Sequence, residues 1–197
     1  MLKTRSGRRA SQRADELLPF IDFLKERDVR SYLEIGARHG DTFYEVMKSL
    51  PKGSVGVAVD LPGGAWGVES SRGYLEDAAK DLRGMGYHVA TVYGDSTSQA
   101  VVDAVIEAFG WYDHRGPVDA ILIDGDHRYE GVSADWHVWG PFAPVIAFHD
   151  IAGEGQIQPT TKDVVEVPRL WNELKPHFTT KEWVGAESTM GIGVIVR

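Results

Sequence analysis

Short apolar runs alternate with segments of helical periodicity along this chain, and this alternation limits the folds it can adopt. The runs occupy 31–35, 55–60, 88–93, 118–124 and 145–148. Between them, apolar residues recur every three or four positions, as in helices that bury one face. Near-continuous apolar strands separated by helices indicate a parallel sheet covered on both sides. The sequence therefore predicts an α/β fold with helices on both faces of the sheet.

Acidic residues stand at or just after the end of each of these predicted strands. They are Glu34, Asp60, Asp95, Asp124 and Asp150. The carboxyl ends of parallel strands meet at one edge of the sheet, and ligands bind there, where the strand order reverses. Solubility alone does not require acids in these places. We therefore expect a ligand site at this edge.

The length and composition of the chain fit one domain that is large enough to bury a substantial core. The chain has 197 residues, a net charge of −8 and no cysteine. Residues 1–13 contain five basic and no acidic side chains, which predicts a basic flexible tail before a single domain over 14–197. The acidic remainder disfavours binding to nucleic acid. No apolar run could span a membrane, and the lack of cysteine suits the cytoplasm. A homo-oligomer is compatible with this composition.

The stretch from Ser31 to Gly40 predicts the first part of the ligand site. Glu34 ends a strand, and Gly36 and Gly40 allow a tight turn into a helix that begins near Asp41. Such a turn presents backbone N–H groups and a positive helix end to a ligand. The spacing is E-x-G-x-x-x-G, which differs from the dinucleotide pattern G-x-G-x-x-G. It favours a nucleoside ligand without a pyrophosphate over NAD.

Two further strand ends suit the rest of a nucleoside. A carboxylate at Asp60 can accept hydrogen bonds from both ribose hydroxyls. Asp95 can accept from an adenine amino group, with Ser96 at the ring edge. Both residue types are also favoured at helix N-termini, so a capping role is the alternative, and the two roles are compatible.

These three blocks resemble motifs I, II and III of class I S-adenosylmethionine (SAM)-dependent methyltransferases, over about residues 30–197. The resemblance implies a Rossmann-like, seven-stranded and mostly parallel sheet whose last strand, within 191–197, is antiparallel. Transferred by position, it assigns cofactor binding to Glu34, Gly36, Ala37, Gly40, Asp60, Leu61, Asp95, Ser96 and Asp124.

The segment Asp124-Gly-Asp-His-Arg-Tyr-Glu130 resembles the I-D-G-D/S-H-x-Y-E signature of small-molecule and sugar O-methyltransferases, a subgroup that includes cephalosporin-hydroxylase-like proteins. The resemblance implies catalytic roles for His127 and Asp124, with His127 as the general base. A histidine suits this task because its ordinary pKa lies near working pH.

Several of these relatives bind magnesium through the acid after strand four and an acidic pair after strand five. Transferred by position, the metal ligands are Asp124, His149 and Asp150. A divalent ion would orient an acceptor hydroxyl and lower its pKa. However, His149 stands where the relatives carry an acid, and magnesium prefers oxygen. Imidazole would weaken the site or favour a transition metal, and Asp124 with Asp150 and waters is a third arrangement.

The working hypothesis is a SAM-dependent methyltransferase that acts on a hydroxyl of a small molecule, such as a sugar or natural-product scaffold. The alternatives are a SAM- or nucleoside-binding module without turnover and an NAD(P)-dependent oxidoreductase. The loop 152–160 is placed to cover the site. Four aromatic residues either line an acceptor pocket or pack in the core: Trp66, Trp136, Trp139 and Phe142.

Overall fold

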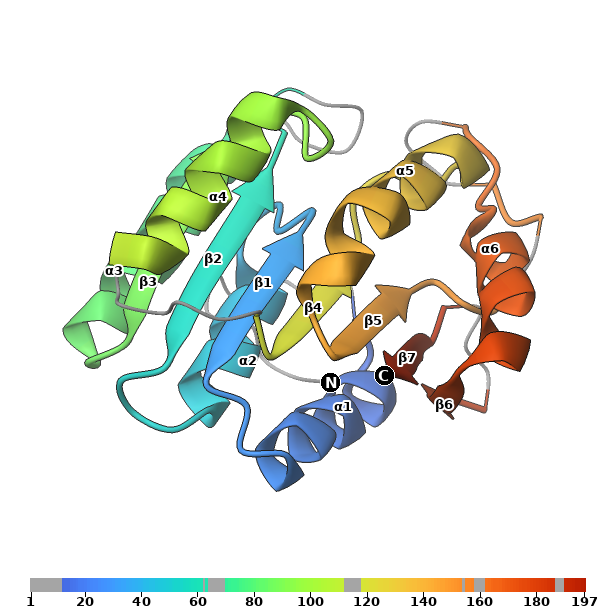
Figure 1. The fold of residues 1–197 in the computed structure, drawn as a ribbon, viewed down its shortest axis with the longest axis horizontal. Coiled ribbons are helices and arrows are strands. Elements are labelled where there is room, and N and C mark those ends of the chain that lie inside the picture. The colour runs from blue at the N-terminus through green and yellow to red at the C-terminus, as the bar shows by residue number, and fades with distance from the viewer. Residues whose placement is uncertain are drawn as a thin grey trace.

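Strands and helices alternate along the chain in a computed structural model that describes residues 12–61, 63, 70–111, 118–153, 155–157, 162–186 and 190–197 (Figure 1). The elements are α1 Ala14–Glu26, β1 Ser31–Ile35, α2 Asp41–Ser49, β2 Val55–Asp60, α3 Ser70–Gly84, β3 His88–Tyr93, α4 Gln99–Trp111, β4 Ala120–Ile123, α5 Tyr129–Trp139, β5 Val145–His149, α6 Val167–Leu174, β6 Thr179–Trp183 and β7 Ile192–Val196. Short 3-10 turns at Gly140–Phe142 and Lys175–His177 follow α5 and α6.

Within the described residues, seven strands form one sheet in the order β3-β2-β1-β4-β5-β7-β6. Strands β1 to β5 are parallel, whereas β7 lies antiparallel between β5 and β6. This confirms the predicted Rossmann-like sheet with an antiparallel last strand. The strand order reverses between β1 and β4, and a crevice opens at such a point because the connections leave toward opposite faces.

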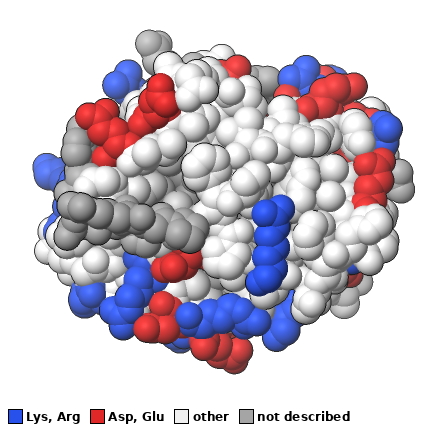
Figure 2. Space-filling model, in the orientation of Figure 1, with Lys and Arg blue, Asp and Glu red and all other residues white. Residues whose placement is uncertain are grey.

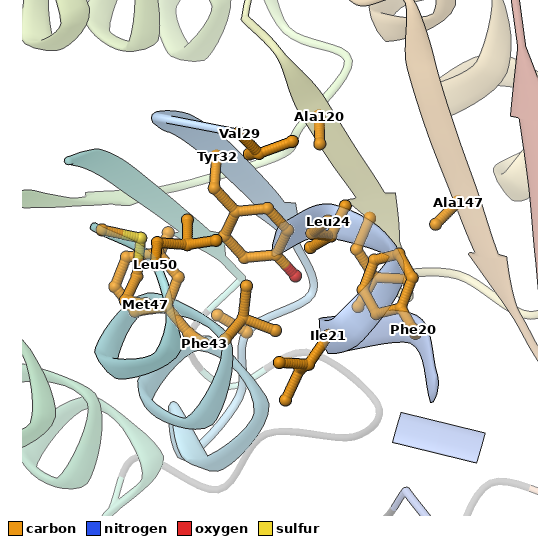
Figure 3. Packing of buried hydrophobic residues seen from close by; sticks show 14 of the residues in the cluster. Phe20, Ile21, Leu24, Val29, Tyr32, Phe43, Met47, Leu50, Ala120 and Ala147 are labelled. Atoms are coloured by element: carbon orange, nitrogen blue, oxygen red, sulfur yellow. The ribbon is translucent and has the colours of Figure 1, made fainter. Parts of the chain in front are cut away.

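Two apolar cores cover the two faces of the sheet. Helices α1, α2 and α3 pack on one face, and α4, α5 and α6 pack on the other. All five residues of β1 are buried, as expected for a central strand. Its Tyr32 stacks on Phe43 of α2 with ring centroids 6.1 Å apart, and Phe20 of α1 belongs to the same buried cluster (Figure 3). Burying side chains of this size stabilises the fold by roughly 1.5–3 kcal/mol each.

Helices α1 and α6 each contain a proline. Helix α1 continues through Pro19. Helix α6 begins at Val167, and Pro168 is favoured in its first turn, where its missing N–H costs no hydrogen bond. The basic residues before Gln12 lie outside the described residues.

The two described tryptophans of α5 belong to the core and not to an acceptor pocket. Trp139 is 1% exposed, and Trp136 packs against Phe148 of β5 with ring centroids 5.8 Å apart. Phe142 also packs against this core. Trp66, the fourth aromatic candidate, falls outside the described residues.

Charged side chains on the face shown in Figure 2 lie mainly toward its edge, with both signs present. Among the residues coloured there, the basic ones do not form a continuous patch across this face. In the part of the chain that the structure describes, no helix is both long and apolar enough to cross a membrane.

The end of β1 approaches the end of β4 so closely that only glycine fits at position 36. Gly36 has a φ of +86°, and a Cβ atom there would lie 2.1 Å from the carbonyl oxygen of Asp124. Backbone atoms cannot move aside without shifting the junction between the two strands. Gly53, by contrast, has a φ of +81° but nothing within 4 Å of its would-be Cβ.

We expect Gly36→Ala to lower the free energy of unfolding by about 3 kcal/mol or more, because it adds a backbone clash to an unfavourable φ. The matched variant Gly53→Ala carries only the unfavourable φ and should lose about 1–2 kcal/mol. Urea denaturation of both variants measures the difference. Equal losses would show that the approach of β1 to β4 does not constrain the fold.

Candidate active site

A cavity of about 650 Å³ lies beyond the carboxyl ends of β1 to β5. It occupies the edge that the sequence predicted for ligand binding, and each of the five strand ends contributes to its wall. Eleven of the twelve predicted site residues line it: Glu34, Gly36, Ala37, Asp60, Leu61, Asp95, Ser96, Asp124, His127, His149 and Asp150.

Gly40 is the predicted cofactor residue that does not line the cavity. It has a φ of +77° and precedes α2 as its N-cap residue. A Cβ atom at this position would lie 2.8 Å from Leu75 Cδ1 of α3. Gly40 therefore allows α3 to pack against the start of α2, a structural role that its place in the motif does not reveal.

The backbone of the glycine turn joins β1 to β2. The N–H groups of Gly36 and Ala37 donate to the carbonyl oxygen of Val59 at 2.9 and 3.0 Å. The N–H of Arg38 donates to Asp60 Oδ1 at 2.9 Å. The prediction that such a turn presents its N–H groups to a ligand is therefore wrong for these three groups, which already have partners.

Asp60 lines the cavity and has one carboxylate oxygen without a hydrogen-bond partner among the described residues. Its Oδ1 is engaged by Arg38, whereas Oδ2 is buried and has no hydrogen-bond partner among the described residues. Burial raises the pKa of Asp60, and hydrogen bonds from the N–H groups of Arg38 and Leu61 oppose that rise. A buried acceptor without a donor is costly, so Oδ2 is suited to receive a hydroxyl group of a ligand.

Glu34 is a buried acid at the centre of the site, with 2% of its surface exposed. The hydroxyl of Tyr32 donates to its Oε2 at 2.7 Å. Burial raises the pKa of Glu34 to about 8, and the negative charge of Asp124 adds to the rise. Glu34 is therefore mainly protonated at pH 7. A cationic ligand group close to both acids would favour its ionised form.

We expect the free energy of unfolding to fall as pH rises from about 4.5 to about 8, because folded Glu34 retains its proton in that range while the unfolded chain releases it. Glu34→Gln should flatten this part of the profile. Urea denaturation between pH 4 and 9, compared with Glu26→Gln on the exposed end of α1, measures the effect. A Glu34→Gln profile parallel to that of the wild type would contradict it.

Ser96 contacts an acid that the sequence analysis missed. Its Oγ donates to Asp135 Oδ1 of α5 at 2.6 Å, and Asp135 also lines the cavity. Burial raises the pKa of Asp135 to about 7. An acid among the apolar residues of α5 was the sequence signal that could have identified Asp135.

Asp95 is exposed and accepts from the N–H of Thr97 at 2.9 Å, so it makes the turn contacts expected of the capping alternative.

Two histidines and two aspartates form a contiguous cluster on the cavity wall. His149 Nδ1 lies 3.1 Å from Asp124 Oδ1 and 3.3 Å from Asp150 Oδ1. His127 Nδ1 lies 2.7 Å from Asp150 Oδ2. The structure therefore brings together both predicted catalytic residues and all three predicted metal ligands.

The charges of this cluster stabilise one another. Burial lowers the pKa of His149, but the carboxylates of Asp124 and Asp150 outweigh it and raise the value to about 9. Burial also opposes the charged form of His127, yet its hydrogen bond to Asp150 raises its pKa above the ordinary value. Burial acts in the opposite sense on Asp150, whose pKa the two histidines lower.

Gln12 completes the cluster, and sequence reasoning missed it. Its Nε2 donates to Asp124 Oδ2 at 2.6 Å, and its Oε1 accepts from the hydroxyl of Thr42 in α2. Gln12 is 6% exposed although the prediction placed it in a flexible tail. No periodicity marks a single polar residue before a helix, so only the folded contact reveals it.

The predicted metal ligands do not form a metal site in this arrangement. Among the described residues, no group of three or more His, Cys, Asp or Glu side chains is arranged to hold a metal ion. All four carboxylate oxygens of Asp124 and Asp150 lie next to a nitrogen of Gln12, His127 or His149. An imidazole nitrogen that donates its N–H to carboxylates has no lone pair left for a metal.

This strand order, with a cavity at the β1/β4 reversal and an antiparallel last strand, is the architecture of a class I methyltransferase. A family model described as a methyltransferase domain matches residues 33–151. The chain therefore belongs to this family of methyltransferase domains, which confirms the class predicted from its sequence. No sequence among curated proteins matches the chain.

Three solved structures illustrate the likeness. The O-methyltransferase from Bacillus cereus in complex with SAH is 16% identical, with a TM-score of 0.63 over 95% of this chain and 83% of that chain. The O-methyltransferase TomG from Streptomyces achromogenes, involved in tomaymycin synthesis and in complex with SAM, is 15% identical, with a TM-score of 0.63 over 94% and 81%. Cofactor-bound Rv0187 from MTB is 18% identical, with a TM-score of 0.68 over 96% and 82%. At these identities the likeness shows a shared fold.

Proposed function

We propose that this protein transfers a methyl group from SAM to a hydroxyl group of a small molecule, such as a sugar or a natural-product scaffold. One observation carries the proposal: the nucleoside-sized cavity and a histidine oriented by a carboxylate share the same wall. His127 contacts Asp150 at 2.7 Å, and both line the cavity. The O-methyltransferases of similar fold that bind SAM or SAH support the choice of cofactor.

The acids that line the cavity could bind the hydroxyl groups and the cationic groups of SAM. The unpartnered Oδ2 of Asp60 is an acceptor for a ribose hydroxyl. Glu34 and Asp124 would face the cationic part of the cofactor, whose charge offsets their mutual repulsion. Ser96, just after β3, and its hydrogen-bond partner Asp135 of α5 line the cavity, where they would meet the adenine ring.

When bound, SAM would supply an electrophilic methyl group on a positively charged sulfur, with S-adenosylhomocysteine as the leaving group when the C–S bond breaks. His127 accepts the hydroxyl proton at Nε2, because its Nδ1 contacts Asp150. The carboxylate of Asp150 holds the ring and stabilises the charge that it gains. Because this contact raises the pKa of His127, the proton-accepting form increases toward alkaline pH.

Divalent-metal assistance is not part of this proposal, because the oxygens of Asp124 and Asp150 already have nitrogen partners within the chain. The predictions of a cytoplasmic location, of no nucleic-acid partner and of a homo-oligomer continue to rest on the sequence alone.

The alternatives are less well supported. A module that binds SAM without turnover would not need the contact between His127 and Asp150. An NAD(P)-dependent oxidoreductase would need the glycine spacing of a pyrophosphate site, which the turn at Gly36 lacks.

We expect His127→Ala to lower kcat by about 10²- to 10⁴-fold while leaving the affinity for S-adenosylhomocysteine nearly unchanged, because it removes only the proton acceptor. Methyl transfer from labelled SAM to a panel of sugars and phenols measures the rate, and calorimetry measures the affinity. His137→Ala on the exposed side of α5 is the control. Undiminished turnover in His127→Ala would disprove the role of this residue as the base.

We expect Asp60→Asn to weaken S-adenosylhomocysteine binding by about 10- to 100-fold, because an amide cannot present two acceptor oxygens to Arg38 and to a ribose hydroxyl. The exposed acid Asp103, changed to Asn, is the matched control and should bind normally. Calorimetric titration of both variants tests this. Normal binding by Asp60→Asn would place the ribose elsewhere.

A further inference from the structure

We propose that His149 takes the place of a divalent cation between Asp124 and Asp150, so that this site works without a metal ion. This inference rests on the proposed function, because it concerns how the methyltransferase site works. Its central claim, that the two carboxylates bind no metal ion, can be tested by metal binding alone.

The position of the ring carries the inference. His149 Nδ1 makes a hydrogen-bond contact with Asp124 Oδ1 at 3.1 Å and lies 3.3 Å from Asp150 Oδ1, so one ring nitrogen lies between the two carboxylates. A cation that bound both acids would have to occupy the same space. The ring extends from the end of β5 and is 4% exposed, so the protein already covers most of its surface.

The other two oxygens are equally engaged. Gln12 donates to Asp124 Oδ2 at 2.6 Å, and His127 Nδ1 lies 2.7 Å from Asp150 Oδ2. Magnesium binds through oxygen atoms in a strict octahedral arrangement. A magnesium ion would therefore have to displace the side-chain nitrogens of Gln12, His127 and His149 before it could bind both carboxylates.

A third acid completes the surroundings of the ring. Glu16 of α1 is fully buried, its Oε2 has no hydrogen-bond partner among the described residues, and its charge acts on His149. Nε2 of His149 is likewise buried without a partner there. Glu16 and His149 therefore each keep one buried polar atom without a hydrogen-bond partner among the described residues.

This arrangement has a consequence for the acceptor. A bound divalent ion would orient an acceptor through the oxygen atoms that coordinate it. Here the acceptor hydroxyl has only to reach His127, which Asp150 holds from the opposite side of its ring. The structure therefore assigns acceptors with a single hydroxyl group to the substrate range, along with those that carry vicinal hydroxyls.

Manganese binding tests the inference directly. Protein saturated with S-adenosylhomocysteine is titrated with Mn²⁺, and free Mn²⁺ is followed by electron paramagnetic resonance. Wild-type protein should bind no Mn²⁺ up to about 1 mM, whereas His149→Asp, which supplies an oxygen ligand and removes the bridging ring, should bind it. His137→Asp makes the same chemical change on the exposed side of α5 and should behave like the wild type.

Activity provides the second measurement. Wild-type turnover should be unchanged by EDTA, whereas His149→Asp should recover turnover only with added Mg²⁺ or Mn²⁺. Stoichiometric Mn²⁺ binding by the wild type, its inactivation by EDTA, or a folded His149→Asp without Mn²⁺ affinity would each overturn the inference. If His149→Asp does not fold, the wild-type titration decides. A wild type that neither binds Mn²⁺ nor methylates any acceptor would refute the proposed function and leave this inference standing.

Discussion

The junction between the ends of β1 and β4 determines the geometry of the whole site. The N–H of Asp124 donates to the carbonyl oxygen of Ile35 at 2.9 Å, and the carbonyl oxygen of Asp124 fills the space that a side chain at Gly36 would need. This contact occurs where the strand order reverses, so it also fixes the width of the crevice. As a result, the acid before the turn, Glu34, lies close enough to Asp124 for each charge to affect the other.

The site accommodates its buried acids in two different ways. Burial raises the pKa of Glu34, although the hydroxyl of Tyr32 and the backbone N–H of Phe43 both donate to its carboxylate. Asp124 and Asp150 instead contact histidines, whose positive charge stabilises carboxylates. The first arrangement leaves an acid that can ionise when a cationic ligand arrives. The second keeps Asp124 and Asp150 next to the two histidines, each carboxylate with an imidazole nitrogen 3.1 or 2.7 Å away.

The sequence predicted the acids of the site because parallel strands place their carboxyl ends at one edge, whatever the details of packing. It could not predict that Arg38 occupies one oxygen of Asp60, since that contact depends on the folded turn. Asp135 was missed because the pattern around it indicates only a helix. Gln12 was missed because the residues around it were predicted to be a flexible tail. The place of His149 was predicted correctly, but the partner of its ring nitrogen depends on side chains from distant segments.

Helix α1 and the residue before it connect this local chemistry to the fold. Gln12 links α2 to the end of β4 through Thr42 and Asp124, and Glu16 lies buried beside His149, with the N–H of Gly185 3.4 Å from its Oε1. These contacts exclude water from the side of the cluster that faces α1, and carboxylates shielded from water interact more strongly with a nearby imidazolium. The apolar packing of α1 on the sheet therefore does more than stabilise the domain. It creates the dry surroundings in which a histidine, rather than a hydrated metal ion, can hold two carboxylates in place.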